Sequence, residues 1–258
     1  MKRLFLVSLR GGCGSTTITA NLAQSLVKIN KPVLAIDAAA ENLLRLHFGL
    51  PYDESDGWAI RMIRGEQWND AGFLSPHGVD FLPYGQLTKN LHQNFTQTHH
   101  QPINDLNQGL LEVCEPSQWQ LFHGDFWQIS SPVWQDFIAS IDMIFVVIMA
   151  DAMNYALLQS HSQHNHVLRE LMDNGKIRFI LNQYQPETEI GRDFSLVLMQ
   201  ELKTLLVPVL MHKDSALTEC AANLTTIQHY SPISQAAKDY QALAFWCVST
   251  FTSTEELS

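Results

Sequence analysis

The sequence has few basic residues and no long apolar run, and each shortage argues against a class of protein. Lysine and arginine number 16 against 26 aspartates and glutamates, which gives a net charge of −10. Broad nucleic-acid binding needs a basic face, so we expect no nucleic-acid partner. The longest apolar run is Met143 to Ala150. It is far shorter than the roughly 20 residues that span a bilayer, so we expect no direct membrane insertion.

Cysteines are also few. Cys13, Cys114, Cys220 and Cys247 are scattered without a Cys-x-x-Cys pair, which favours neither a disulfide framework nor a zinc site. The start, Met1-Lys2-Arg3 followed by a short apolar strand, is unlike a signal peptide. Apolar residues make up 46% of the 258 residues, enough for a sizeable core. We expect a soluble, cytoplasmic protein with one domain over residues 1–251 and a polar, acidic tail over residues 252–258.

Short apolar runs alternate with helical patterns along most of the chain. Predicted strands fall at residues 4–9, 33–36, 79–82, 119–125, 141–149, 177–181 and 206–211. Predicted helices follow the first glycine cluster and fall at residues 43–48, 57–65, 102–115, 153–173, 192–205, 215–223 and 233–250, while residues 86–104 predict a surface loop. This alternation predicts an α/β fold, a doubly wound and mostly parallel sheet flanked by helices.

A glycine cluster follows the first predicted strand and opens the first predicted helix. It reads Arg10-Gly11-Gly12-Cys13-Gly14-Ser15-Thr16-Thr17. Glycines let backbone N–H groups close around a phosphate, and the helix dipole adds partial positive charge at the helix start. Ser15 stands where a standard P-loop has its lysine. The alternative is a glycine-rich turn without a ligand. Three glycines followed by three hydroxyl residues argue against it.

With Arg10 at its first basic position, this segment resembles the variant P-loop of the MinD/ParA-like ATPases. In that family the first basic residue reaches the partner's nucleotide across a dimer interface. An arginine suits this role because it is planar and always charged. The resemblance implies that Arg10, Gly11, Gly12, Cys13, Gly14, Ser15, Thr16 and Thr17 bind ATP, and that Arg10 also acts in catalysis. It also implies that the Thr16 hydroxyl is a ligand for Mg²⁺.

The resemblance gives catalytic and metal roles to two strand ends. Asp37, at the first switch segment, is expected to act in catalysis and near the metal. Ala39 replaces the second carboxylate of that segment, which in the family positions the attacking water. Asp125 follows a strand that is only partly apolar. It either contacts Mg²⁺ through water or caps the next turn, and the sequence leaves both interpretations open.

The base of the nucleotide is expected further along the chain. In the MinD/ParA-like proteins an asparagine at the position of Asn182 hydrogen-bonds the adenine, and an asparagine side chain offers both a donor and an acceptor. His212 and Asp214 fall in the segment that flanks the base. His161 and His164 share a helical face, but their polar surroundings favour exposed histidines over a metal site.

Segments spread along the chain narrow the resemblance to the BcsQ family, the MinD/ParA-like proteins of bacterial cellulose-secretion operons. They are the glycine cluster with a hydroxyl in place of the lysine, Asn42-Leu43-Leu44-Arg45-Leu46, Gly57-Trp58-Ala59, Trp68-Asn69-Asp70-Ala71-Gly72, Leu82-Pro83-Tyr84-Gly85-Gln86-Leu87 and Ala244-Phe245-Trp246-Cys247. The resemblance implies an ATP-bound homodimer. It also implies a small partner protein, BcsR, and association with the cellulose synthase secretion complex at the inner membrane.

Together these expectations describe a regulatory or scaffolding nucleotide switch with slow or absent ATP hydrolysis. The loop lysine and the switch carboxylate, missing at Ser15 and Ala39, normally stabilise or align the transition state of phosphoryl transfer. One alternative is an active ParA-type ATPase that positions cargo or partitions DNA, which predicts a basic surface stripe. Another is a reductase related to the iron–sulfur-carrying members of the group. It would need paired cysteines, and the spacing offers no convincing set.

Overall fold

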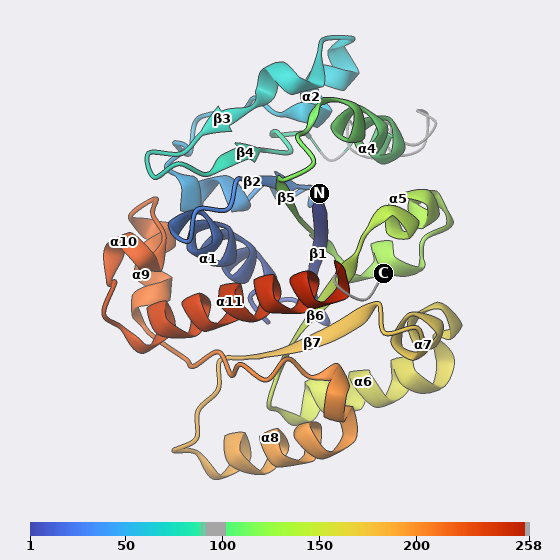
Figure 1. Cartoon of the computed structure of the whole chain (residues 1–258), viewed down its shortest axis with the longest axis vertical. Coiled ribbons are helices and arrows are strands. Elements are labelled where there is room, and N and C mark those ends of the chain that lie inside the picture. The colour runs from blue at the N-terminus through green and yellow to red at the C-terminus, as the bar shows by residue number, and fades with distance from the viewer. Residues whose placement is uncertain (89, 91–101, 256–258) are drawn as a thin grey trace.

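The computed structural model describes residues 1–88, 90 and 102–255, which form one seven-stranded sheet with helices on both faces (Figure 1). The strand order is β3–β4–β2–β5–β1–β6–β7. The strands are β1 (Lys2–Ser8), β2 (Val33–Asp37), β3 (Phe73–Leu74), β4 (Asp80–Leu82), β5 (Trp119–Asp125), β6 (Met143–Met149) and β7 (Ile177–Asn182). Neighbouring strands are parallel except for β3 and β4. The predicted α/β fold with a mostly parallel sheet is confirmed.

Two groups of helices cover the two faces of the sheet. The α-helices are α1 (Ser15–Lys28), α2 (Trp58–Arg64), α4 (Pro102–Val113), α5 (Gln135–Ser140), α6 (Ala152–His164), α7 (His166–Asp173), α8 (Glu189–Leu202), α9 (Ala216–Ala222), α10 (Ile227–Tyr230) and α11 (Gln235–Glu255). Short 3₁₀ turns are η1 (Leu44–Phe48), η2 (Trp68–Ala71), η3 (Phe126–Ser130), η4 (Pro132–Trp134) and η5 (Lys203–Leu205). Helices α1, α9, α10 and α11 pack on one face, and α2, α4, α5, α6, α7 and α8 pack on the other.

Strand β1 is buried on both faces, which is typical of a central parallel strand. Successive side chains point to opposite faces. Leu4 and Leu6 therefore join the core beside α1 and α11, whereas Phe5 and Val7 join the core of the other face. All four side chains are fully buried. The continuous apolar run that predicts this strand results from burial on both sides.

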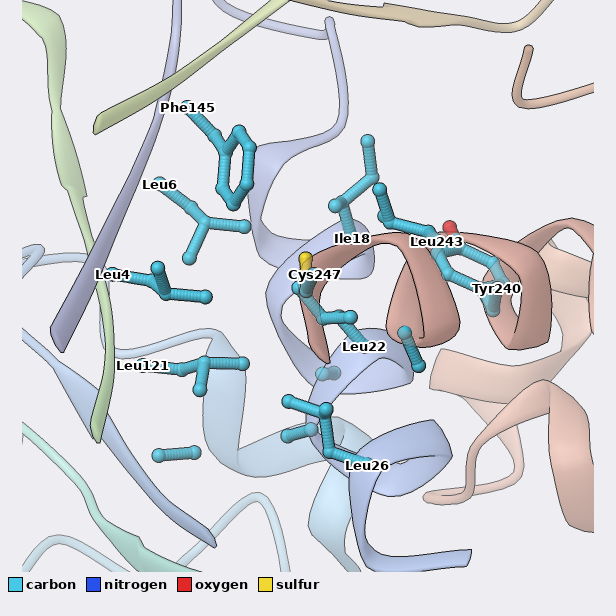
Figure 2. Close-up of a cluster of buried hydrophobic side chains, with 14 of the residues drawn as sticks. Leu4, Leu6, Ile18, Leu22, Leu26, Leu121, Phe145, Tyr240, Leu243 and Cys247 are labelled. Atoms are coloured by element: carbon cyan, nitrogen blue, oxygen red, sulfur yellow. The ribbon is translucent and has the colours of Figure 1, made fainter. Parts of the chain in front are cut away.

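Helix α1 packs between the sheet and α11, and this packing fixes where the helix begins. Ile18, Leu22 and Leu26 recur at four-residue spacing, so they share one face, and all are fully buried (Figure 2). They form one cluster with Leu243 of α11 and with the side chains of the sheet. The first residue of the helix, Ser15, is thereby held close to the carboxyl end of β1.

Residues 206–211 do not form the predicted strand. They run beside β7, and the N–H groups of Val207 and Met211 donate to β7 carbonyls at 2.9 and 3.0 Å. These two donors lie four positions apart, whereas the β7 carbonyls of Phe179 and Leu181 lie only two apart, so the segment bulges away from a regular parallel ladder. The prediction of a strand is wrong for this reason, although the segment does follow the edge of the sheet.

The predicted helix over residues 153–173 is two helices, α6 and α7. Asn165 leaves helical geometry between them, with φ −99° and ψ 98°. Its side-chain oxygen accepts a hydrogen bond from Leu168 N at 3.1 Å and so caps the start of α7. A side chain that favours a helix start over a helix interior therefore divides the pattern.

Helix α11 continues beyond its predicted end at residue 250 and reaches Glu255. Thr252 Oγ1 donates to Val248 O at 2.8 Å, a local bond within the helix. Residues 252–255 are therefore helical, and only residues 256–258 of the predicted tail lie outside the described part of the chain. Across residues 1–88, 90 and 102–255, no helix combines the length and the apolar composition needed to cross a bilayer.

One strand of the sheet was not predicted, and one predicted loop cannot be compared. Strand β3 has two residues and pairs antiparallel with β4. A strand of that length is too short to show an alternating pattern. The predicted loop over residues 86–104 lies largely outside the described residues, which omit 89 and 91–101.

A buried histidine, His47, lies in η1, with 5% of its surface exposed. Burial lowers the pKa of His47 to about 4. A hydrogen bond with the Thr225 backbone works to raise this pKa, and the nearby His123 works to lower it. A histidine in an unfolded chain has a pKa of about 6.5. The folded state therefore binds fewer protons than the unfolded state. The resulting stability is complete above about pH 6.5 and is lost as the pH falls toward 4.

Replacing His47 with glutamine should remove this titration. Between pH 7 and pH 5, His47 should lower the free energy of unfolding of the wild-type protein by about 2 kcal/mol, and the His47→Gln variant should lack that loss. Urea unfolding at the two pH values measures the difference. The exposed His166→Gln serves as a control and should keep the wild-type pH dependence. An equally steep dependence in His47→Gln would contradict the assignment.

Candidate functional site

The direction of the winding changes at β1, and this creates a crevice at the carboxyl ends of the central strands. From β1 the chain passes through α1 to β2 on one side, and from β5 it passes through α5 to β6 on the other. Open α/β sheets bind ligands at such a point. A cleft of about 520 Å³ lies there.

This phosphate-side cleft gathers most of the predicted loop residues. It is lined by Ser8, Arg10, Gly11, Gly12, Gly14, Ser15, Thr16, Thr17, Ala39, Glu41, Leu43, His123, Gly124, Asp125, Phe126 and Gln183. Of the residues predicted to contact the phosphates or the metal, two do not line it. Cys13 and Asp37 are fully buried behind its wall.

A second cleft of about 430 Å³, the base-side cleft, adjoins the first and shares Gly14, Thr17 and Gln183 with it. It is lined by Gly14, Thr17, Asn182, Gln183, His212, Lys213, Asp214, Ser215, Leu217, Thr218 and Ala221. The structure therefore brings the predicted base-side residues, which come from two later parts of the sequence, next to the glycine loop.

The glycine loop is held in shape by the end of β7. Asn182 Nδ2 donates to Cys13 O at 2.7 Å, and Gln183 Nε2 donates to Gly12 O at 3.0 Å. Gly14 has φ +98°, and a Cβ atom there would lie 2.5 Å from Asn182 Nδ2. Glycine is therefore needed at this position both for its left-handed backbone and for the close approach of the asparagine.

The start of α1 is suited to an anion. The helix has 14 residues and begins at Ser15; its N-cap residue, Gly14, has no side chain, and one of the first N–H groups, that of Ser15, donates to Ser8 Oγ. The first N–H groups of a helix have no partner within the helix, and the dipole favours negative charge beside them. Together with the open glycine loop, this arrangement fits the phosphate groups of a nucleotide.

Ser15, at the position of the loop lysine, is turned toward the sheet. Its hydroxyl oxygen accepts from the Ser8 hydroxyl at 2.9 Å, and its backbone N–H donates to Ser8 Oγ at 3.1 Å. The residue is only 5% exposed. Its hydroxyl therefore belongs to a buried network and does not replace the reach of a lysine into the cleft.

His123 is the site residue that the sequence analysis missed. Its Nδ1 lies 2.9 Å from Asp37 Oδ1, and its Nε2 lies 3.0 Å from Thr16 Oγ1 and 3.3 Å from Ser15 Oγ. The ring is 6% exposed. No clear pattern marks it: a Walker B aspartate follows four apolar residues, but Gln120 interrupts the run before His123, and the aspartate of this strand is Asp125. What singles out His123 is its place beside the Thr16 hydroxyl.

Asp37 lies behind the cleft. Its carboxylate accepts from the backbone N–H groups of Ala39 at 3.2 Å and Leu44 at 3.0 Å, in addition to the contact with His123. The catalytic and metal-associated roles expected of Asp37 stay predictions. In this structure His123 is the side chain that connects its carboxylate to the cleft.

Asp125 ends β5 and faces the cleft. Its backbone N–H donates to Gln128 Oε1 at 2.7 Å, one half of a capping box at the start of η3. Burial raises the pKa of Asp125, and the nearby charge of Glu41 adds to the shift. The residue thus begins a turn and lines the cleft at the same time, and its contact with Mg²⁺ stays a prediction.

Arg10 folds back onto its own chain at the rim of the cleft. Its Nη2 donates to Asp151 Oδ2 at 2.8 Å, with 31% and 28% of the two side chains exposed. Asp151 also caps α6 by accepting from Asn154 N at 2.7 Å. Partial burial works to raise the pKa of Asp151, but hydrogen bonds from Asn154 and Arg10 outweigh it, so this pKa lies below its usual value.

In the base-side cleft, hydrogen bonds fix His212 and Asp214, the two predicted residues that follow β7 in the chain. His212 Nδ1 lies 2.9 Å from Asp239 Oδ2, and His212 N donates to the same oxygen at 2.8 Å. Asp214 Oδ1 accepts from Ala216 N at 2.9 Å, at the start of α9. These bonds hold two polar side chains at the cleft wall, where the roles expected of them toward a base stay predictions.

The fold is similar to that of solved MinD proteins. The cell division ATPase MinD of Pyrococcus furiosus aligns with a TM-score of 0.72 at 20% identity, covering 97% of this chain and 100% of that one. The septum site-determining protein MinD of Pyrococcus horikoshii OT3, complexed with Mg-ADP, aligns with a TM-score of 0.71 at 19% identity, covering 95% of both chains. At these identities the likeness shows the fold alone.

The sequence comparisons go further. The family described as "Cellulose biosynthesis protein BcsQ" matches residues 1–248. The cellulose biosynthesis protein BcsQ of Escherichia coli (strain K12) is 30% identical over 252 residues, which cover 98% of this chain and 96% of that protein. The chain therefore belongs to the BcsQ family of cellulose biosynthesis proteins.

Proposed function

We propose that the chain is an ATP- and Mg²⁺-binding subunit of the bacterial cellulose biosynthesis and secretion machinery that works as a nucleotide-dependent dimeric switch or scaffold. The observation that carries this proposal is the pair of joined clefts at the start of α1. One cleft suits phosphates, and the other places hydrogen-bonding side chains where a base would lie. Family membership supplies the cellulose system.

On this proposal the backbone N–H groups of the glycine loop and of the first turn of α1 hold the phosphates. Thr16 supplies a hydroxyl ligand for Mg²⁺, and Asp125 contacts the ion through water. Mg²⁺ commonly keeps several waters and takes one or two protein ligands beside phosphate oxygens, so this small donor set is sufficient. When bound, the ion neutralises charge on the phosphates. Asn182, His212 and Asp214 face the base.

The same geometry supports slow or absent hydrolysis. The Ser15 hydroxyl is engaged with Ser8 and His123. A serine hydroxyl carries no charge, and this one is held in place by its hydrogen bonds. Ser15 therefore cannot stabilise the transferred phosphate as a lysine would. Ala39 lines the cleft but has only a methyl group, so it cannot position a water molecule. ATP would then serve mainly as a ligand for assembly.

In this proposal Arg10 supports the dimer by contacting the nucleotide of the partner subunit. The guanidinium lies at the rim of the phosphate-side cleft, in an ion pair that is about one-third exposed. Exposed ion pairs contribute little stability, roughly 0–1 kcal/mol, so the phosphates of a partner subunit can compete for this arginine. The proposal extends to the small partner BcsR and to recruitment from the cytoplasm to the cellulose synthase complex at the inner membrane, as the family implies.

Replacing Arg10 with alanine should abolish ATP-dependent dimers while the monomer stays folded, because the lost ion pair is partly exposed. Analytical ultracentrifugation with Mg²⁺ and ATP measures the dimer. Arg192→Ala is the matched control, since Arg192 lies on α8 with 56% of its side chain exposed. An Arg10→Ala protein that dimerises normally with ATP would remove this role from Arg10.

Native mass spectrometry tests the proposed function as a whole, because it reports subunit count and nucleotide identity together. After long incubation with Mg²⁺ and ATP, we expect a dimer that carries two intact ATP molecules. A dimer with ADP would show real turnover, and the cleft carboxylates of Glu41 and Asp125 would then become the candidates for activating water. A monomer without nucleotide would refute the proposal.

A further inference from the structure

The imidazole of His123 connects the sheet to the first turn of α1. Strand β5 carries the ring, Asp37 of β2 holds its Nδ1, and its Nε2 faces the hydroxyl groups of Thr16 and Ser15. Because the ring is only 6% exposed, water competes little for these contacts. The neighbours of the ring therefore determine how it is oriented and protonated.

Those neighbours favour a proton on Nδ1. A carboxylate only accepts hydrogen bonds, so Nδ1 donates to Asp37. The carboxylate is fixed in turn by the backbone N–H groups of Ala39 and Leu44. Nε2 faces two hydroxyl groups, and each of them is able to donate. One proton on the ring and a lone pair on Nε2 satisfy all of these contacts.

A hydroxyl that donates to Nε2 keeps its oxygen lone pairs for another ligand. Thr16 Oγ1 lies 3.0 Å from Nε2, and Thr16 also lines the phosphate-side cleft. In standard P-loop proteins the hydroxyl at this place binds Mg²⁺, together with an aspartate of the neighbouring Walker B strand. Here the group beside the hydroxyl is an imidazole.

The loop lysine and the Walker B aspartate of a standard site carry opposite charges, whereas here neither Ser15 nor His123, the residue beside the Thr16 hydroxyl, is a lysine or an aspartate. Ser15 and His123 touch each other, with Oγ and Nε2 3.3 Å apart. A lysine at position 15 would bring a cation against the ring. An aspartate at position 123 would face Asp37 without a compensating cation, which is unfavourable for two buried carboxylates. The two replacements therefore balance each other in charge.

We propose that His123, oriented by Asp37, is a positioning residue that directs the Thr16 hydroxyl toward the Mg²⁺ of a bound nucleotide, and that Ser15 and His123 jointly replace the lysine–aspartate pair. The role toward Mg²⁺ rests on the proposed function. The ring geometry does not, because it exists in the chain without nucleotide.

Nitrogen-15 NMR of the nucleotide-free, histidine-labelled protein reports the tautomer directly. Signals of His123 are assigned by their loss in the His123→Gln variant. We expect a proton on Nδ1 and a lone pair on Nε2. A proton on Nε2 would overturn the proposal even if the protein binds ATP. The tautomer can thus be judged independently of the proposed function.

A double-mutant cycle tests the role toward Mg²⁺. With a non-hydrolysable ATP analogue bound, His123→Ala should weaken Mg²⁺ binding by about 10-fold or more, which is the usual effect of losing an outer-shell partner. Thr16→Val should weaken it as well. The double variant should be no weaker than Thr16→Val alone, because His123 acts through that hydroxyl.

Two controls make this cycle decisive. The affinity for the analogue in EDTA should change by no more than about twofold in His123→Ala, and His166→Gln should bind as the wild type does. Additive losses in the double variant would overturn the positioning role. A wild-type protein that binds no nucleotide would instead refute the proposed function.

A second cycle tests the charge balance through thermal stability. His123→Asp should lower Tm because it places a second buried carboxylate beside Asp37, and Ser15→Lys should lower it because it breaks the buried hydrogen bonds of Ser15 with Ser8 and His123. The double variant should recover most of the loss, since the two new side chains compensate each other. A double variant that is destabilised by the sum of the two single effects would show that the replacements are independent.

Discussion

The packing of α1 between the sheet and α11 is the constraint on which the site depends. Ile18, Leu22 and Leu26 are fully buried against both layers, so the helix has little freedom to slide or turn. Its first turn is therefore held at the end of β1, where the glycine loop, Thr16 and His123 meet. An anion site made of backbone N–H groups depends on where the backbone lies. The hydrophobic core thus positions a polar site.

The charges around the phosphate-side cleft differ from those of a standard P-loop. Glu41 and Asp125 place carboxylates at the wall, Ser15 is neutral, and Arg10 is paired with Asp151. Attraction for a polyphosphate then rests on the start of α1 and on a divalent cation, since a free ATP would meet carboxylates with little compensating charge. On the proposed function, the chain would therefore bind the magnesium complex of a nucleotide as a unit.

Much of this fold was predictable from the sequence, because strands buried on both faces give continuous apolar runs, as in β1 and β6. Where the predicted strands and helices were wrong or incomplete, the causes are local. Residues 206–211 bulge away from the β7 ladder, Asn165 divides a helical pattern, and β3 is too short to show a period. The glycine loop was found from its composition. His123 was not, because its role comes from β5 lying between β1 and β2, which no local pattern encodes.

The amide of Asn182 lines the base-side cleft and also supports the loop that borders the phosphate-side cleft. It holds the carbonyl of Cys13 behind the glycine loop, and it forms part of the wall where a base would lie. A ligand that contacts this amide from the base-side cleft therefore affects the hydrogen bond that holds the glycine loop. Linkage requires the reverse as well, so a phosphate that orders the loop also fixes the face that the base meets. The two halves of a nucleotide would thus be sensed cooperatively through a single side chain.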